Sequence, residues 1–241
     1  MANTFYESHF RSLKNLAYIV YALLAVQILA FVLGVVTSLA LLISPDWSLD
    51  LDGEESMPVF MIFLGFTALL RIGALLLTIV FLLIWEHRAY SNLSPLKATN
   101  LEHSPGWAVG WWFIPFANLL KPFQVMKEIW RESDPAYDEQ LGFLPLATSA
   151  PAIFGLWWAT WILGNIALRI SDRQFDQVTS DYSTAAYLYL VGSVVSIIAA
   201  VSLVFIVKDI TSRQSERNAR LEMSGAVGTA PPPPPTFGNN F

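Results

Sequence analysis

The chain has 241 residues, of which 54% are hydrophobic and only 14% charged, and its mean hydropathy is positive at +0.49. This composition argues against a soluble domain and indicates a membrane protein. The absence of cysteine excludes disulfides and thiolate chemistry. The net charge is −5, and the sequence has no dense basic patch, so nucleic-acid binding is not expected.

Four long apolar stretches predict an all-α membrane protein with four transmembrane helices. Each stretch exceeds the roughly 20 residues that cross a bilayer core of about 30 Å. The first is not preceded by a short charged leader with a small-residue cleavage site, so we interpret it as a retained helix. The predicted spans are residues 16–43, 57–85, 141–168 and 182–207.

The positions of the cations predict the orientation. With residues 1–15 in the cytoplasm, eleven of the fourteen lysines and arginines fall in cytoplasmic segments, whereas only Arg169 and Arg173 fall outside. The positive-inside rule favours this arrangement. We therefore predict a multi-pass protein of the cell membrane with both termini cytoplasmic, in which residues 16–210 form the membrane domain. Residues 211–241 are predicted to be a cytoplasmic tail that continues the last helix and then becomes Pro-rich and disordered.

Between spans two and three lies the segment GWAVGWWFIPFANLLKPF, Gly106 to Phe123. Its tryptophans are typical of side chains at headgroup depth, and Pro115 interrupts any single helix. If the segment crossed the membrane, everything after it would change sides, with six cations inside and seven outside. We therefore predict that residues 105–132 form a re-entrant or interfacial element. In that element Asn118 would satisfy loose backbone carbonyls.

Lys121 to Glu132 predict an amphipathic helix. At 100° per residue the apolar residues occupy one arc, and the polar residues, including Lys127, Glu128, Arg131 and Glu132, occupy the other. Such a helix lies in the membrane interface or packs on the ends of the spans. Pro122 suits its first turn.

The run WEHRAYSNL followed by SPGWAVGWWFIPFANLLKPFQVMKEIWRESDP resembles the signature of the bacterial domain-of-unknown-function family number 4328. The resemblance is dense from Trp85 to Pro135 and extends over about residues 16–207. It implies membrane helices around a tryptophan-proline block and no established activity. The residues that it carries over are Trp107, Gly110, Trp111, Trp112, Pro115, Asn118, Pro122 and Trp130.

Arg71 lies near the middle of the second span, where a cation costs roughly 2.5–3.5 kcal/mol on insertion-based scales. Gln27, serine hydroxyls, backbone carbonyls or a tryptophan face are candidates to offset this cost. One hypothesis is that Arg71 binds an anionic group of a lipid or small solute. The other is that Arg71 is satisfied within the protein or snorkels to the surface.

Catalytic chemistry has little support in the sequence. The spans contain no Asp, Glu, His, Cys or Lys, so an intramembrane acid or base is not expected. Glu86-His87 and Glu102-His103 match no metal-binding spacing, and we predict neither a metal site nor a cofactor.

The leading interpretation is a non-enzymatic membrane protein that organises lipid, or a protein partner or second copy, at the cytoplasmic face. The residues proposed for it are Trp107, Trp111, Trp112, Asn118, Lys127 and Arg131. The alternative is a small transporter or channel for an anionic solute that uses Arg71, with Gln27 beside it. A membrane-surface enzyme using His87 and His103 ranks third.

Overall fold

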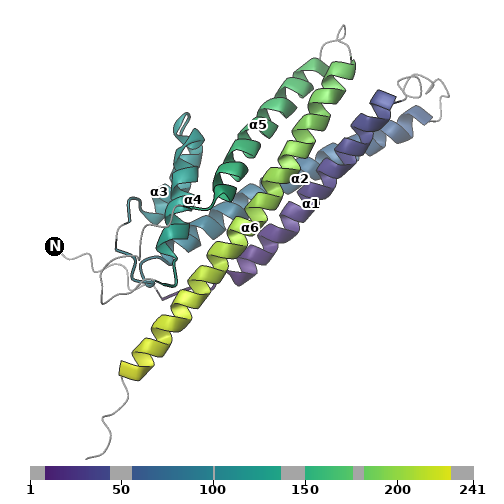
Figure 1. Cartoon of the computed structure of the whole chain (residues 1–241). Coiled ribbons are helices and arrows are strands. Elements are labelled where there is room, and N and C mark those ends of the chain that lie inside the picture. Colours follow the sequence, from purple (N-terminus) through teal and green to yellow (C-terminus); the bar gives the residue numbers. More distant parts are fainter. Residues whose placement is uncertain (1–8, 44–55, 100, 137–149, 176–181, 229–241) are drawn as a thin grey trace, which may run out of the picture.

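The computed structural model describes residues 9–43, 56–99, 101–136, 150–175 and 182–228, and within them every regular element is a helix (Figure 1). Four helices are long and apolar enough to cross a membrane, as predicted. They are α1 (Lys14–Ile43), α2 (Ser56–Ser91), α5 (Ala152–Phe175) and α6 (Tyr182–Gly228). Between α2 and α5 lie the shorter elements α3 (Pro105–Gly110), η2 (Trp111–Phe113), η3 (Ala117–Leu119) and α4 (Lys121–Glu132).

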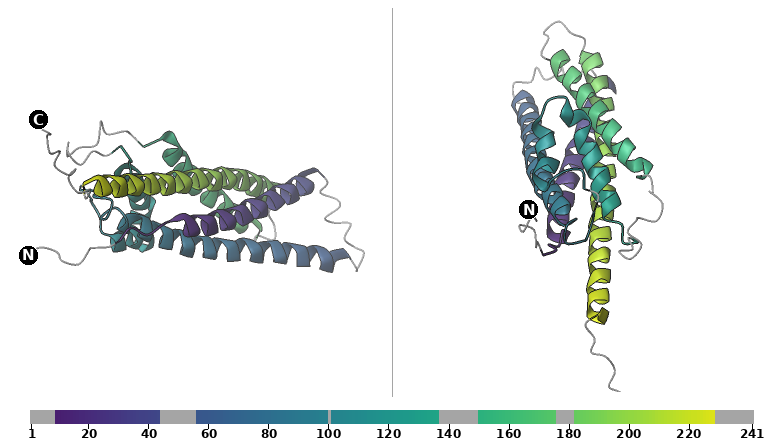
Figure 2. Two further views of the ribbon diagram at one scale, coloured as in Figure 1. Left: turned by 90° about the horizontal axis from the view of Figure 1, so that it is seen from below. Right: turned by 90° about the vertical axis from the view of Figure 1, so that its left-hand side faces the viewer.

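The four long helices pack in the order α2, α1, α6, α5 (Figures 1 and 2). The α5–α6 and α1–α6 pairs make the most extensive contacts, and α2 packs along α1. Consequently α2 and α5 are the outer members of the row. The short elements lie between them at one end and contact both. Figure 1 shows α6 continuing beyond the other long helices at that end.

Small residues permit the closest helix contacts. A Cβ atom on Gly34 would lie 2.6 Å from the Tyr189 ring, and one on Gly192 would lie 3.0 Å from Leu168. These values show that α1 and α5 approach α6 at points where only glycine fits. In addition, Ser171 donates a hydrogen bond of 2.8 Å from its hydroxyl to the Ala185 carbonyl and so joins α5 to α6.

The third span differs from its predicted limits of 141–168. Its helix begins at Ala152, directly after Pro151, and continues to Phe175 through Arg169 and Arg173. Absence of charge marked an apolar stretch but could not locate the first helical residue, which here follows a proline. Nor did the two arginines end the helix, because cations suit a helix C-terminus. Residues 137–149 lie outside the described part of the chain.

The second and fourth helices are longer than their predicted spans. α2 continues six residues past Trp85, and α6 runs on as a helix through Gly228. The Pro-rich residues 231–235 lie outside the described part of the chain. These extensions matter because the short elements pack against them.

All fourteen lysines and arginines lie in the described residues, and eleven of them gather at the end where α1 begins, α2 ends and α5 begins. We call this the basic end. The most fully buried large side chains also concentrate there, and they include Trp85, Tyr90, Phe154, Met126 and Ile210. Farther along the spans, many leucines and isoleucines of α2 and α5 are exposed. The protein is therefore packed most tightly at its basic end and presents apolar surface along its spans.

Candidate functional site

The short elements form one hairpin, residues 105–132, that packs beside the spans at the basic end. α3 and η2 form the first arm and α4 forms the second (Figure 1). Ser104 begins α3 by accepting the Trp107 N–H at 3.4 Å, and Pro105 and Pro122 occupy first-turn positions where no N–H is needed. α3 packs on α2, and α4 packs on α2, α3 and α6, so the chain reverses direction between the two arms.

Trp112 inserts between the two outer spans. Its indole N–H donates a 2.7 Å hydrogen bond to Glu86 Oε2 on α2. Its ring meets Trp158 and Trp161 of α5 edge-on, with centroids 5.9 and 6.0 Å apart. Glu86 is fully buried, and its Oε1 has no hydrogen-bond partner. A single tryptophan thus connects α2 to the second and third turns of α5.

The turn of the hairpin has a strained backbone. Phe116 has φ 66° and ψ −41°, and the Ala117 N–H donates to the Pro115 carbonyl at 2.8 Å. This is a γ-turn of the uncommon kind, which costs a non-glycine residue energy. Phe113, Phe116 and Leu120 are 71%, 86% and 62% exposed. The turn therefore carries an exposed apolar surface, which we call the apolar tip. Its exposed residues are Phe113, Ile114, Phe116, Leu119 and Leu120.

Asn118 was expected to bond the free backbone carbonyls of the turn, but a different residue bonds one of them. The Leu119 carbonyl accepts the Trp158 indole N–H at 2.8 Å. Asn118 instead donates its backbone N–H to the Ile114 carbonyl at 3.0 Å. An indole from another helix performs the predicted role because Trp158 of α5 lies directly against the turn.

The apolar arc of α4 is buried against the bundle. Val125, Met126 and Ile129 are almost completely inaccessible. Trp130 donates its indole N–H to Asp209 of α6 at 2.5 Å, and the Arg213 guanidinium lies 4.0 Å from the centre of its ring. Of the two predicted arrangements for this helix, the structure shows the packed one.

Two carboxylates that helical periodicity placed on the polar arc are buried. Glu128 Oε2 lies 2.8 Å from His103 Nδ1, and Glu128 Oε1 accepts the Tyr90 hydroxyl at 2.9 Å and the Glu102 N–H at 2.6 Å. Glu132 accepts the Arg131 guanidinium at 3.0 Å. Because the segment before α3 covers this side of α4, the side chain of Glu128 is only 4% exposed. These bonds fasten the base of the hairpin to α2.

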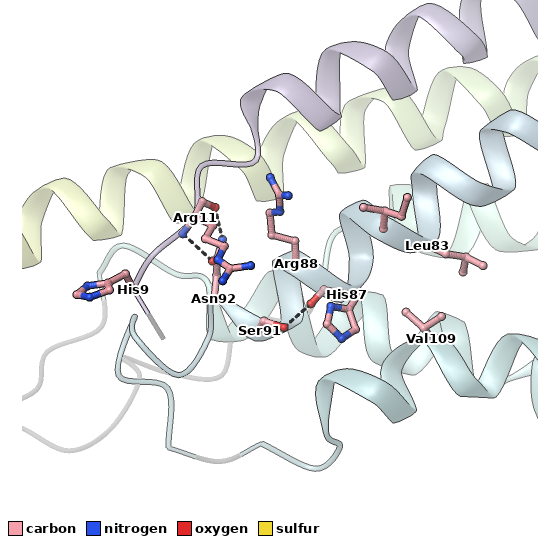
Figure 3. A pocket seen from close by; sticks show the side chains of 9 residues that line it. His9, Arg11, Leu83, His87, Arg88, Ser91, Asn92 and Val109 are labelled. Carbon is pink, nitrogen blue, oxygen red and sulfur yellow. Dashed lines mark hydrogen bonds between the residues drawn. The ribbon is translucent and has the colours of Figure 1, made fainter. Parts of the chain in front are cut away.

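Beside the hairpin lies a cavity of about 500 Å³, which we call the basic groove. Figure 3 shows Leu83 and Val109 toward one end of it and Arg11, Arg88 and His9 toward the other. It lies between α2, α3 and the segment that precedes α1. Its lining residues are His9, Arg11, Leu83, Ile84, His87, Arg88, Ser91, Asn92 and Val109.

Asn92 holds the wall of the basic groove in place. Its buried carboxamide accepts the Arg11 N–H at 3.0 Å and donates to the Arg11 carbonyl at 2.8 Å (Figure 3). Asn92 also donates to Gln214 of α6 at 3.0 Å, and Gln214 donates to the Ala89 carbonyl at 2.8 Å. The backbone of Arg11 is thereby fixed against α2 while its side chain stays exposed.

The two residues predicted to act together inside the spans are not partners. Arg71 donates to the Tyr189 hydroxyl at 2.9 Å and lies 5.6 Å from the centre of that ring, whereas Gln27 donates to Thr78 at 3.1 Å. Sequence spacing did not identify Tyr189 because residue depth was counted from approximate span ends. Arg71 thus has a tyrosine partner within the protein.

The remaining predicted site residues belong to the hairpin but not to the groove. Trp107 is half exposed and its ring lies 4.9 Å from that of Trp111. Lys127 is exposed with its ammonium 5.1 Å from the Phe123 ring. Arg131 bonds to Glu132, as described above. The groove residues Arg11 and Arg88 were missed because they lie about eighty positions apart; the only available signal was the cation count near the span ends.

The fold and site define an all-helical protein with four helices long and apolar enough to cross a membrane and a tryptophan-rich hairpin beside them. A family model described as Domain of unknown function (DUF4328) matches residues 52–212, which cover α2, the hairpin, α5 and the larger part of α6. The chain belongs to this family. Comparison with curated proteins and with solved structures found no match.

Proposed function

We propose that the protein is a non-enzymatic membrane protein that organises lipid at the cytoplasmic face of the cell membrane through its hairpin. The observation that carries this proposal is the combination of an exposed apolar tip with a tightly held base. Phe113, Phe116 and Leu120 are exposed, whereas Trp112 and Glu128 are hydrogen-bonded to α2 and Trp130 to α6.

An exposed apolar tip is stable in lipid and costly in water, because burying apolar surface contributes about 25 cal/mol per Å². The tip lies beside the second turn of α5, where Trp158 bonds to the Leu119 carbonyl and Leu156 is also exposed. An apolar tip that is inserted rigidly into one leaflet restricts the motion of the acyl chains around it. Lipid order, and not turnover of a substrate, is the expected consequence.

The charge distribution supports the cytoplasmic assignment. The basic end holds eleven cations, while α5 carries two near its opposite end. Since the positive-inside rule counts lysine and arginine near the ends of spans, the basic end and its hairpin belong on the cytoplasmic side. The polar groups nearest the hairpin also favour a structural role, because His103, Glu128 and Tyr90 bind one another.

The test uses full-length protein in vesicles of dioleoyl phosphatidylcholine that contain a spin-labelled lipid. Replacing Phe113 and Leu120 with serine is expected to lower the number of motionally restricted lipids per protein. The matched control replaces Leu163 and Ile166 of α5, which are similarly exposed, with serine. If the two double variants lose restricted lipid equally, or neither loses any, the hairpin has no special effect on lipid and the proposal is wrong.

A further inference from the structure

We infer that the basic groove binds the headgroup of an anionic phospholipid, with the upper part of an acyl chain along Leu83 and Val109. This inference rests on the proposed function, because it names the lipid class that the basic end selects. It concerns a different surface from the apolar tip: no residue of the tip lines the groove.

The groove divides into a cationic part and an apolar part. Arg11 and Arg88 stand together on its wall, and His87 lies between them and the apolar end in Figure 3. Leu83, Ile84 and Val109 line that end. Along α2 the apolar residues come earlier, on the side of the span, and Arg88 comes at its end. Along α2, the apolar surface is thus followed by cationic surface, in the same order in which the acyl chains of a bilayer leaflet are followed by the headgroups.

Two arginines line this groove without an acidic counterpart. None of its described lining residues is acidic, and in the described part of the chain no carboxylate pairs with Arg11 or Arg88. Arg88 makes only a long 3.5 Å contact with the Ser12 carbonyl. Arginines elsewhere at the basic end do bind carboxylates: Arg131 pairs with Glu132 and Arg213 with Asp209. Two arginines without a carboxylate partner on one groove favour an anion, and guanidinium suits phosphate geometry.

The fixed position of Arg11 makes this a preformed site. Its backbone is bound at both its N–H and its carbonyl by buried Asn92, which α6 holds through Gln214. Binding therefore orders side chains but requires little loss of backbone entropy. An apolar end adjoining the bilayer selects a lipid over a soluble phosphate, because a soluble ion leaves Leu83 and Val109 without a partner.

The experiment titrates the full-length protein in mild detergent with dioleoyl phosphatidylglycerol or dioleoyl phosphatidylcholine and counts bound lipids by native mass spectrometry. The wild-type chain is expected to bind its first phosphatidylglycerol more tightly than phosphatidylcholine. Arg11→Gln with Arg88→Gln should weaken that first step by about 30-fold, given the usual contribution of two cations near a lipid surface. Binding of phosphatidylcholine should not change.

The matched control is Lys14→Gln with Lys208→Gln, which removes the same charge from exposed positions at the basic end outside the groove. It should retain the wild-type preference. Equal losses in both double variants would show a diffuse surface potential, and no loss in the groove variant would show that the groove is unused; either overturns the inference. Val109→Trp fills the apolar end without changing charge and should also weaken the first step.

A further measurement distinguishes a lipid headgroup from a soluble phosphate as the bound anion. Adding sn-glycerol 3-phosphate in excess should not displace phosphatidylglycerol, whereas displacement would show a soluble-anion site and overturn the lipid assignment. Thermal unfolding of each variant checks that it is folded, and Arg11→Gln is mild because only the backbone of Arg11 bonds to Asn92. The hairpin test uses phosphatidylcholine alone. A negative result for phosphatidylglycerol binding in the groove therefore does not contradict the proposed function of the hairpin, and a negative hairpin test does not exclude phosphatidylglycerol binding in the groove.

Discussion

Replacing Glu128 with leucine should detach the base of the hairpin. The carboxylate accepts the Tyr90 hydroxyl, the Glu102 N–H and a contact from His103 Nδ1, all between 2.6 and 2.9 Å. It is only 4% exposed, so water cannot replace these bonds without the hairpin moving. Leucine fits the helix and its volume is similar, which leaves loss of the three acceptor contacts as the main effect.

The magnitude follows from the number of groups left unsatisfied. A buried donor without a partner costs about 1–3 kcal/mol. The substitution removes the acceptor of the Glu102 N–H and the partner of His103 Nδ1, whereas the Tyr90 hydroxyl still has the His103 carbonyl at 2.8 Å. Because the added apolar surface of leucine offsets part of this, we expect Glu128→Leu to lower the free energy of unfolding by about 3–4 kcal/mol. Glu128→Gln keeps one acceptor oxygen and should lower it by roughly 1–2 kcal/mol.

The assay is equilibrium unfolding in mixed micelles, followed by tryptophan fluorescence, with amide hydrogen exchange at residues 101–113 as the local readout. Glu216→Leu is the control, because Glu216 forms an exposed pair with Arg220 and should change the free energy by less than about 0.5 kcal/mol. A loss below about 1 kcal/mol for Glu128→Leu, or unchanged exchange in the first arm of the hairpin, would refute the view that buried Glu128 holds it.

Two further predictions concern the spans. In intact cells of the cysteine-free parent, a membrane-impermeant maleimide should label Arg173→Cys but not Ser104→Cys, and the opposite pattern would reverse the proposed orientation. Arg71→Leu should raise the free energy of unfolding in detergent, because removing a cation from an apolar span saves about 2.5–3.5 kcal/mol, more than its single bond to Tyr189 contributes. Anion flux in proteoliposomes that this substitution abolishes would favour the transport alternative instead.

The four spans and the α4 boundaries were predictable because their signals are local. A long uncharged stretch must cross a bilayer as a helix, and the alternation of polar and apolar residues from Lys121 to Glu132 has the helical period. The predicted helix coincides with α4 at both ends. The start of α5 was not predictable in this way, because apolar composition continued across Pro151 while the helix began after it.

The candidate site was only partly predictable. Trp112 and Trp111 were identified as a tryptophan-rich element, but nothing in their spacing indicated Glu86 or Trp158 as neighbours. Arg11 and Arg88 illustrate the same difficulty, since they come together only when the segment before α1 packs on the end of α2 through Asn92.

The sequence by itself determined the number of spans, the hairpin between the second and third, and the basic character of one end, because hydrophobic length, proline positions and charge are properties of short segments. Only the tertiary structure decided which polar groups are buried and which cations face a cavity. Periodicity assigns Glu128 to the polar face of α4, yet the chain from Leu101 to Ser104 covers that face and buries the carboxylate. Burial depends on what packs against a helix, and that information lies in distant residues.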